Sequence, residues 1–233
     1  MDKRECAIVT GAGSGIGAAT AVKLAGEGFC VVLTGRQRAK LDQTAARIAG
    51  DDNVRIVEGD MREAATADRL LSTVLDAWGR LDVIVNSAGI ASRVAIADVS
   101  PALLHEEMQT NAFGPAQLIA KAWPIFAKQR RGTIVNISSL ASSDPLPGFF
   151  SYGASKAALE SLGRSAAREG APLGVRAYNI SPGAVATPLL DALFADAPPQ
   201  AAMSPNVIAE VVIECIRGLC PDASTQTIVV TGP

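Results

Sequence analysis

Short apolar runs alternate with longer segments of helical period along the whole chain. The runs are rich in valine and isoleucine, as strands covered on both faces are expected to be. They lie at residues 6–10, 30–34, 55–59, 82–86, 133–138, 175–181 and 227–231. Such alternation is typical of βα units. It therefore predicts an α/β fold, a doubly wound parallel sheet of about seven strands with helices on both faces.

Two local patterns refine this prediction. Ser100 followed by Pro101 combines a hydroxyl N-cap with proline at the first helical position, so a helix is expected from there to about Lys128. The segment 182–205 contains several prolines and has no clear period. Such a segment inside an α/β chain is more often functional than a linker. We expect a substrate flap at about 183–205.

Composition and charge limit the classes of function. The chain has 233 residues, of which 48% are hydrophobic and 19% charged, which fits a single domain spanning 1–233. The net charge is −2, and no basic block is longer than a pair such as Arg130 and Arg131. Neither a nucleic acid nor an anionic membrane would find a basic surface here. A small-molecule partner is expected.

The N-terminus and the cysteines indicate a cytoplasmic protein. Residues 1–10 carry four charges before a short apolar run, which is unlike a signal peptide, and no apolar stretch is long enough to span a membrane. The four cysteines lack the C-x-x-C spacing of metal or redox sites. Cys6 and Cys30 lie in strand-like runs, where buried structural thiols are expected. We expect reduced thiols and no metal site.

A glycine-rich loop directly follows the first predicted strand and precedes an alanine-rich helix from about Ala18 to Glu27. It has the form G-x-x-x-G-x-G, and it comprises Gly11, Ala12, Gly13, Ser14, Gly15, Ile16 and Gly17. Glycines let the backbone approach a diphosphate, and the positive end of the next helix holds the charge. A flexible turn is the alternative, but the position between strand and helix favours a dinucleotide site.

The stretch SYGASK at residues 151–156 places Tyr152 four positions before Lys156. On a helix this spacing puts both side chains on one face. An ammonium beside a phenol would lower the phenol pKa toward working pH, which suits a proton donor or acceptor. The spacing alone is weak evidence, because the chain has six lysines and could show it by chance.

Together these motifs resemble the short-chain dehydrogenase/reductase family. The resemblance rests on TGAGSGIG (10–17), Asp60, NSAG (86–89), Asn111, ISS (137–139), Tyr152 with Lys156, and SPGAVAT (181–187). The motifs follow the family's order over almost the whole chain. The resemblance implies a Rossmann fold and hydride transfer between a nicotinamide cofactor and a carbonyl or secondary alcohol.

The resemblance also implies a catalytic tetrad. Tyr152 would transfer the proton. Lys156 would set the pKa of the Tyr152 phenol and hold the nicotinamide ribose, and Ser139 would stabilise the substrate oxygen. Asn111 would hold a water that relays protons through the lysine. Ser138, the neighbour of Ser139, is the alternative strand-end serine.

Further cofactor contacts follow from the same resemblance. Asp60 and the Met61 amide would meet the adenine, although Asp60 could instead cap the helix that begins near Glu63. A small-residue turn after the fourth strand would approach the ribose and also tie strands together. Its expected contacts are Asn86, Ala88 and Gly89. The contacts expected after the sixth strand, near the nicotinamide, are Pro182, Gly183, Val185 and Thr187.

The end of the second strand predicts the cofactor. Where an acidic residue would select NAD, this chain has Gly35, followed by Arg36. A guanidinium pairs well with a 2′-phosphate, so NADP(H) is preferred and NAD(H) remains possible. Arg36 and Arg38 could instead be the solvated start of a helix. Ser14 supplies no second cation from the glycine loop.

We therefore predict an NADP(H)-dependent carbonyl reductase or alcohol dehydrogenase. The alternatives are an NAD-dependent alcohol or hydroxy-acid dehydrogenase and a non-catalytic NAD(P)-binding regulator. Apolar residues predominate in the predicted substrate loops 90–99, 140–151 and 183–205, where Arg93 could meet a carboxylate and Phe149 could line the pocket. His105 has no predicted role. A homodimer or homotetramer is expected from the resemblance.

The chain also departs from the family. Tyr178 stands where the family commonly has asparagine, and the C-terminus differs from the family's usual ending.

Overall fold

Seven parallel strands form one sheet in the computed structural model, which describes residues 4–195, 201–220 and 227–232. The strands are β1 (Cys6–Thr10), β2 (Cys30–Gly35), β3 (Val54–Glu58), β4 (Val83–Asn86), β5 (Gly132–Ile137), β6 (Val175–Pro182) and β7 (Thr227–Val230). Their order is β3-β2-β1-β4-β5-β6-β7. The predicted strands and the doubly wound parallel sheet are confirmed.

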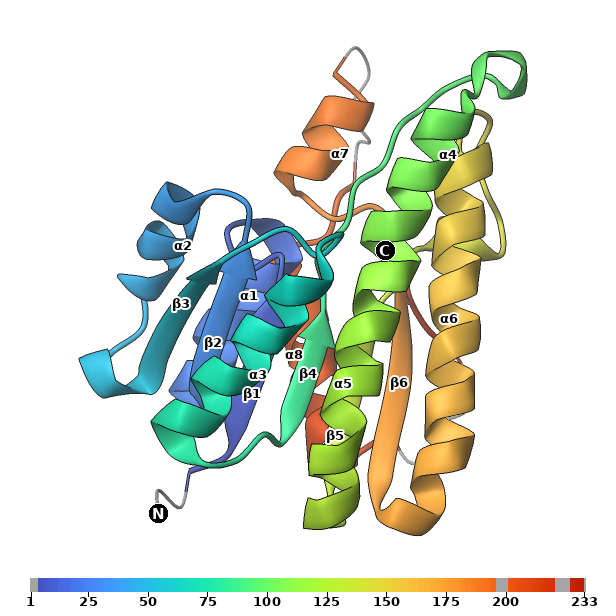
Figure 1. Ribbon diagram of the computed structural model, residues 1–233. Coiled ribbons are helices and arrows are strands. Elements are labelled where there is room, and N and C mark those ends of the chain that lie inside the picture. Colours follow the sequence, from blue (N-terminus) through green and yellow to red (C-terminus); the bar gives the residue numbers. More distant parts are fainter. Residues whose placement is uncertain (1–3, 196–200, 221–226, 233) are drawn as a thin grey trace.

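Helices cover both faces of this sheet (Figure 1). One face carries α1 (Gly15–Gly26), α2 (Arg38–Ala45) and α8 (Pro205–Arg217), and the other α3 (Ala64–Trp78), α5 (Gly114–Gln129) and α6 (Phe150–Gly170). Alternate residues of one strand enter opposite cores: Val9 packs under α1, and Ile8 under α3. The valine-rich runs therefore lack a polar side because both faces are buried.

The strand order reverses between β1 and β4. The chain winds outward from β1 through β2 to β3, then crosses back to β4 and continues outward to β7. Loops at the carboxyl ends of β1 and β4 therefore leave in opposite directions, which opens a crevice where ligands bind in folds of this kind.

The predicted helix from residue 101 to about 128 is present, but its winding changes in the middle. Helix α4 (Pro101–Met108) begins after Ser100, whose hydroxyl accepts the Leu103 amide hydrogen at 3.1 Å. A π-helical segment, Gln109–Phe113, then joins it to α5. Wider turns of this type are frequent at functional sites, and this one contains Asn111.

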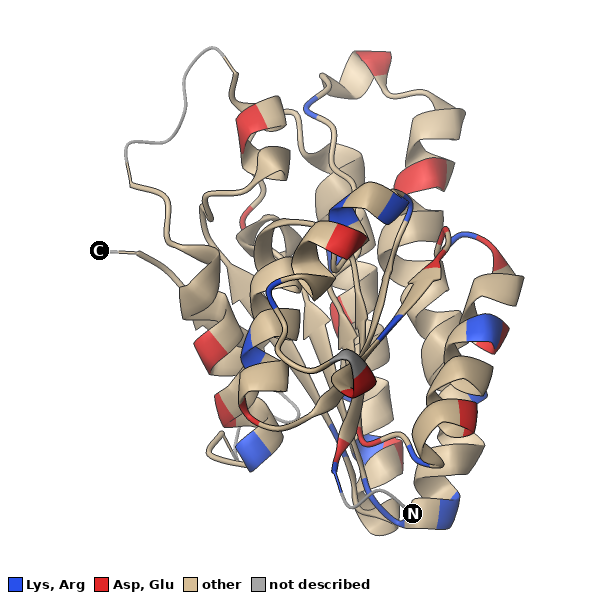
Figure 2. Ribbon diagram, turned by 90° about the vertical axis from the view of Figure 1, so that its left-hand side faces the viewer, with Lys and Arg blue, Asp and Glu red and all other residues tan. Residues whose placement is uncertain are grey.

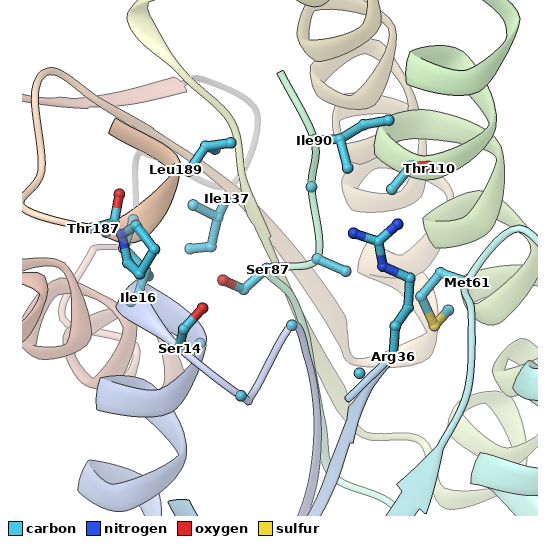
Figure 3. Close-up of a pocket in the computed structure, with 18 of the residues that line it drawn as sticks. Ser14, Ile16, Arg36, Met61, Ser87, Ile90, Thr110, Ile137, Thr187 and Leu189 are labelled. Atoms are coloured by element: carbon cyan, nitrogen blue, oxygen red, sulfur yellow. The ribbon is translucent and has the colours of Figure 1, made fainter. Parts of the chain in front are cut away.

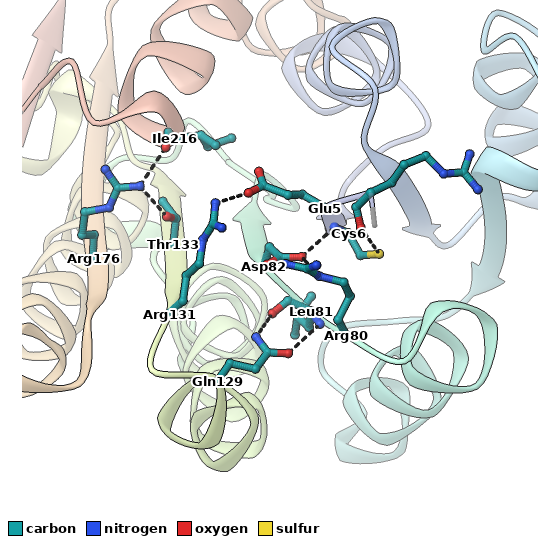
Figure 4. A network of polar contacts seen from close by, with 11 residues as sticks. Glu5, Cys6, Arg80, Leu81, Asp82, Gln129, Arg131, Thr133, Arg176 and Ile216 are labelled. Atoms are coloured by element: carbon teal, nitrogen blue, oxygen red, sulfur yellow. Dashed lines mark hydrogen bonds and ion pairs between the residues drawn. The ribbon is translucent and has the colours of Figure 1, made fainter. Parts of the chain in front are cut away.

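The amino ends of the strands are joined by a polar network (Figure 4). Asp82, only 3% exposed, accepts from Arg80 through two nitrogens, at 2.6 and 2.8 Å, and from the Cys6 amide at 2.9 Å. The Gln129 side chain exchanges two hydrogen bonds with the Leu81 backbone. This network lies at the opposite end of the sheet from the β1–β4 crevice.

Basic and acidic side chains are interspersed on the helices (Figure 2). No helix of the described residues is long and apolar enough to span a bilayer. The four cysteines form no disulfide in the described part of the chain, and the predicted burial of Cys6 and Cys30 is confirmed. Burial raises the pKa of the Cys6 thiol to about 12. The expected flap contains a short helix, α7 (Pro188–Leu193), while residues 196–200 of that segment lie outside the described residues.

Candidate active site

A cleft of about 280 Å³ lies at the carboxyl ends of the strands (Figure 3). The predicted cofactor contacts that line it are Gly11, Gly13, Ser14, Gly15, Ile16, Gly17, Arg36, Asp60, Met61, Ala88, Gly89, Tyr152, Lys156 and Thr187. Thr187 lies beside Ile16, and Arg36 extends from the end of β2 past Met61. Residues from both halves of the chain thus meet at one crevice.

The glycine loop is held by close backbone contacts. A Cβ on Gly17 would lie 2.3 Å from the Gly11 carbonyl oxygen, and one on Gly11 would lie 2.8 Å from Ala88. The Thr10 hydroxyl accepts the amide hydrogens of Ser87 and Ala88, both at 3.0 Å. The cradle therefore requires glycine, and it fits a diphosphate at the N-terminus of α1.

Three charged residues line the cleft near the carboxyl ends of β2 and β3: Arg36, Asp60 and Lys40. Burial raises the pKa of Asp60, but hydrogen bonds from Arg62 and the charge of Arg36 outweigh this, so the pKa is lowered overall. Lys40 reaches this wall because its Cβ lies 3.1 Å from where a Cβ of Gly13 would be. Asp60 also accepts the Arg62 amide hydrogen at 2.9 Å, but Arg62 precedes α3 and that helix has no side-chain cap, so the alternative role of Asp60 as its cap is wrong.

Tyr152 is 8% exposed and lies in the first turn of α6. Burial raises the pKa of its phenol, a hydrogen bond with Ser139 opposes that effect, and the charge of Glu107 adds to it. The predicted lowering by Lys156 is thus wrong for the protein without cofactor. Desolvation of the phenolate outweighs any help from the ammonium.

Lys156 lies one helical turn after Tyr152, as predicted, with its Nζ 5.9 Å from the Tyr152 ring centroid. Its ammonium donates to the Ile137 carbonyl at 2.8 Å. Burial lowers the pKa of Lys156 to about 8, against the charge of Glu160. The lysine is therefore poised to lose its proton within a mildly alkaline range.

The two candidate serines at the end of β5 have different surroundings. The Ser138 hydroxyl is buried and donates to Glu160 Oε1 at 2.7 Å. The Ser139 hydroxyl accepts the Ala141 amide hydrogen at 3.2 Å and lies close enough to Tyr152 to oppose the rise of the phenol pKa. Ser138 lines the cleft, but its hydroxyl is bound to Glu160 on α6. Ser139 instead lies beside the phenol of Tyr152.

Asn111 is fully buried in the π-helical segment. Its amide donates to the Ile90 carbonyl at 2.8 Å and to the Ser155 hydroxyl at 2.9 Å, and its oxygen accepts the Ile90 amide hydrogen at 2.9 Å. A Cβ on Gly89 would lie 3.3 Å from the Asn111 oxygen and 3.4 Å from Lys156 Nζ. Asn111 therefore adjoins the lysine while it fixes the loop after β4.

Four predicted cofactor contacts do not line the cleft: Asn86, Pro182, Gly183 and Val185. Asn86 is drawn into a row of amides across three strands, because it donates to Asn136 at 2.9 Å and Asn136 donates to Asn179 at 3.0 Å. The Gly183 amide pairs with Val230, and Val185 forms a bridge with Met203. After β6, the first residue that lines the cleft is Thr187, whose methyl would lie 2.9 Å from a Cβ of Gly15.

Comparison with known proteins agrees with this geometry. The profile of the short chain dehydrogenase family matches residues 5–198. The chain belongs to the short-chain dehydrogenase/reductase family. It is therefore an oxidoreductase of the NAD(P)-dependent kind.

Sequence relatives of this dehydrogenase include uncharacterized oxidoreductases of staphylococci. The one from Staphylococcus epidermidis is 34% identical over 189 residues, which is 81% of each chain. The one from Staphylococcus saprophyticus is 37% identical over 186 residues, 78% of this chain and 79% of that one.

Solved structures show the same fold. A short chain dehydrogenase/reductase family protein is 35% identical with a TM-score of 0.88, covering 99% of this chain and 97% of that one. A 3-ketoacyl-(acyl-carrier-protein) reductase from Brucella melitensis, complexed with NADH, is 28% identical with a TM-score of 0.87, covering 98% and 97%. Levodione reductase, at 24% identity and a TM-score of 0.91 over 97% and 95%, shares the fold.

Aromatic side chains from the predicted substrate loops pack around Tyr152. Phe149 packs against Tyr152 with ring centroids 5.7 Å apart, and Phe194 from the end of α7 packs against Phe149 at 6.1 Å. The Arg93 guanidinium lies 5.2 Å from the centroid of the Phe194 ring. Residues from all three predicted substrate loops therefore converge on Tyr152.

Sequence reasoning missed three charged residues of the site. Lys40 lines the cleft, Glu160 accepts from Ser138 and Ser142 at 2.7 and 2.6 Å, and Glu107 is fully buried beside the first turn of α6. Glu107 and Glu160 carried a usable signal, since each lies four positions from a predicted tetrad member on the same helix. Lys40 had none, because its approach to Gly13 depends on how α2 packs.

Proposed function

We propose that this enzyme interconverts a carbonyl and a secondary alcohol, using NADP(H) and the residues Tyr152, Lys156, Ser139 and Asn111. The observation that carries the proposal is the Ser139 hydroxyl beside the buried phenol of Tyr152, where it opposes the rise of the phenol pKa, one helical turn from Lys156. It lies at the end of a cleft whose glycine loop fits a diphosphate. A bound nicotinamide supplies the hydride for the carbonyl carbon.

Tyr152 acts as the proton donor to the carbonyl oxygen in reduction. Its raised pKa keeps the phenol protonated at neutral pH, which is the form that a general acid requires. Ser139 lies beside the same phenol, so its hydroxyl can donate to the oxygen on which negative charge develops. Oxidation runs through the same groups with Tyr152 as the base.

Lys156 and Asn111 support the proton transfer. With its pKa near 8, Lys156 can give up a proton more easily than an exposed lysine and so can help to reprotonate Tyr152. Asn111 holds the Ile90 backbone beside the lysine. We assign Asn111 to the positioning of this loop and to a water near Lys156.

The preference for NADP(H) rests on two cations. Arg36 and Lys40 line the adenosine half of the cleft, and neither has an ion-pair partner among the described residues. A 2′-phosphate would supply the missing partner, with Arg36 offering a planar pair of donors. NAD(H) is the second candidate, favoured by the NADH bound in the related Brucella reductase.

We further propose one domain over residues 1–233, with 183–205 as a flap over the substrate. Support comes from Phe194, which reaches Phe149 and so closes the aromatic side of Tyr152. We also propose a homodimer or homotetramer in the cytoplasm, supported by Phe113, which is 43% exposed on the helix that carries Asn111. Size-exclusion chromatography with light scattering tests the assembly.

A panel of ketones, hydroxy acids and secondary alcohols, assayed with NADPH and with NADH, tests the proposal. We expect turnover with at least one substrate and a loss of about 10²- to 10⁴-fold in Tyr152→Phe. Cofactor binding by the variant, followed by fluorescence, should stay within about twofold of the parent, since a phenol hydroxyl in the substrate half contributes little to it. Cofactor binding without turnover across the panel would favour the non-catalytic regulator.

A further inference from the structure

Glu107 is a fully buried carboxylate between α4 and the start of α6. Its Oε1 accepts the amide hydrogen of Ser92 at 2.7 Å. Its Oε2 is also buried and has no hydrogen-bond partner among the described residues. The Ser151 hydroxyl is near enough to favour the ionised form, but its geometry leaves Oε2 unpaired.

A buried carboxylate with an unpaired oxygen lowers the stability of the folded protein. Burial is the largest effect on its pKa and raises it, while the nearby Ser151 hydroxyl and the hydrogen bond from Ser92 oppose the rise. No described lysine or arginine forms an ion pair with it. An apolar side chain of similar volume would avoid the desolvation penalty. The carboxyl group is therefore not explained by folding.

Its position connects it to the candidate active site. Glu107 lies one helical turn before Asn111 and on the same face. The titratable groups that interact with it are Glu106 on its own helix, which raises its pKa, and Tyr152 on the packed helix α6. Between Glu107 and Tyr152 the effect is direct, because the charge of Glu107 disfavours the phenolate.

The contact with Ser92 gives a second connection. The Ser92 amide belongs to the loop after β4, and the next residue, Arg93, lies on the Phe194 ring. Val94 continues this loop and donates to the Gly148 carbonyl at 2.9 Å, next to Phe149. The carboxyl group thus anchors the loop that faces the aromatic substrate side.

We propose that Glu107 is a positioning residue for the reaction. It holds the Ser92 loop against the helix that carries Asn111, and its charge controls how readily Tyr152 gives up its proton. The charge of ionised Glu107 adds to the effect of burial in keeping the proton on the phenol, and neutralising Glu107 removes that part. This inference rests on the proposed function, in which Tyr152 is the acid and base.

Two variants separate the two roles. Glu107→Gln keeps an oxygen that can accept from Ser92 but removes the charge, while Glu107→Met removes both. Asp98→Asn, which neutralises an exposed carboxylate near the same loop, is the control. For oxidation of an alcohol, we expect Glu107→Gln to lower the apparent pKa of kcat/KM by at least ~0.5 unit. The control should leave that pKa unchanged.

The KM values test the anchoring role. Glu107→Gln should keep the substrate KM within about twofold of the parent, because the Ser92 hydrogen bond survives. Glu107→Met should raise KM by about fivefold or more, because that hydrogen bond is lost. Equal KM values in the two variants would overturn the anchoring role.

Two readouts do not depend on turnover. The chain has only two tyrosines, so a Tyr178→Phe background isolates the ultraviolet titration of Tyr152, whose midpoint should fall when Glu107→Gln is added.

In urea unfolding, the stability of Glu107→Gln relative to the parent should increase with pH, because ionisation of Glu107 costs the folded state alone. If both comparisons show no dependence on Glu107, the proposal is wrong. Positive results without turnover would reject only the proposed function.

Discussion

Lys156 donates its hydrogen bond to the Ile137 carbonyl, although its ammonium lies only 5.9 Å from the centroid of the Tyr152 ring. The lysine is thus held at the end of β5 before any cofactor arrives. A ribose hydroxyl can join the remaining hydrogens of the ammonium without moving the side chain. The site is preorganised at this residue.

Lys156→Met should show the cost of burying the lysine. The pKa of Lys156 is lowered from 10.5 to about 8, so the folded state binds fewer protons than the unfolded chain between these values. The stability of the parent protein therefore rises with pH over this range. Below pH 8 the folded protein bears the full cost of burying a charged lysine. Relative to Lys156→Met, the parent should gain roughly 2–3 kcal/mol from pH 7 to 10 in urea unfolding. The exposed Lys121→Met should give no such trend.

The two directions of the reaction should differ in pH dependence. Reduction needs a protonated Tyr152, and its raised pKa should keep kcat/KM level through neutral pH. Oxidation needs the phenolate, so its kcat/KM should increase by about tenfold per pH unit below the pKa of Tyr152. Initial rates from pH 6 to 10 check this, and a reduction rate that rises with pH would contradict it.

Arg36→Ala should weaken binding of NADPH by about 10- to 100-fold, because a hydrogen-bonded pair with a charged phosphate is lost. NADH binding should change little. Lys40→Ala should have a smaller effect of the same kind. Arg38 provides the control, since it pairs with Asp42 at 2.9 Å and is absent from the cleft wall. Fluorescence titration of both cofactors gives the measurement, and equal losses for both would remove Arg36 from the choice of cofactor.

Gly17→Ala and Gly26→Ala form a matched pair in one helix. A Cβ at Gly17 would lie 2.3 Å from a backbone oxygen, whereas a Cβ at Gly26 meets nothing within 4 Å. We expect Gly17→Ala to abolish measurable cofactor binding and lower stability by more than ~2 kcal/mol. Gly26→Ala should stabilise the protein by about 0.5–1 kcal/mol with unchanged binding. Thermal unfolding with and without NADPH distinguishes the two.

Asp82→Ala should destabilise the protein by about 3–5 kcal/mol, because Arg80 and the Cys6 amide would lose their buried partner. The KM for cofactor should not change, since the network lies at the far end of the sheet. Urea unfolding and steady-state kinetics measured on the same preparation check both statements. A higher KM would mean that the two ends of the sheet are coupled.

The sequence predicted most of the fold because its strands are buried on both faces and interrupted by glycine or polar turns. Cys6–Thr10 and Val83–Asn86 needed no long-range information to be recognised. The π-helical segment at Asn111 could not be predicted in this way, since the wider turn is stabilised by the Ile90 backbone, which lies about twenty residues earlier in the chain.

The candidate site was predicted where a motif fixes its own local geometry, as in the glycine loop and the Tyr152–Lys156 spacing. The sequence did not predict those parts of the site whose surroundings depend on how distant helices and strands pack together. Glu107 adjoins the exposed His105 in sequence, yet α6 covers it completely. Asn86 was expected at the cofactor, but the register of three strands aligns it with Asn136 and Asn179. The raised pKa of Tyr152 likewise depends on burial that spacing does not reveal.

The polar network of Figure 4 has no residue in common with the cleft wall. Substitutions there can raise or lower the melting temperature while the chemistry stays as it is. Buried and mostly apolar strands separate the two ends, so we expect each end to vary independently of the other. A designer could therefore increase thermal tolerance at residues such as Arg80 and Gln129, and separately alter substrate choice at the aromatic loops.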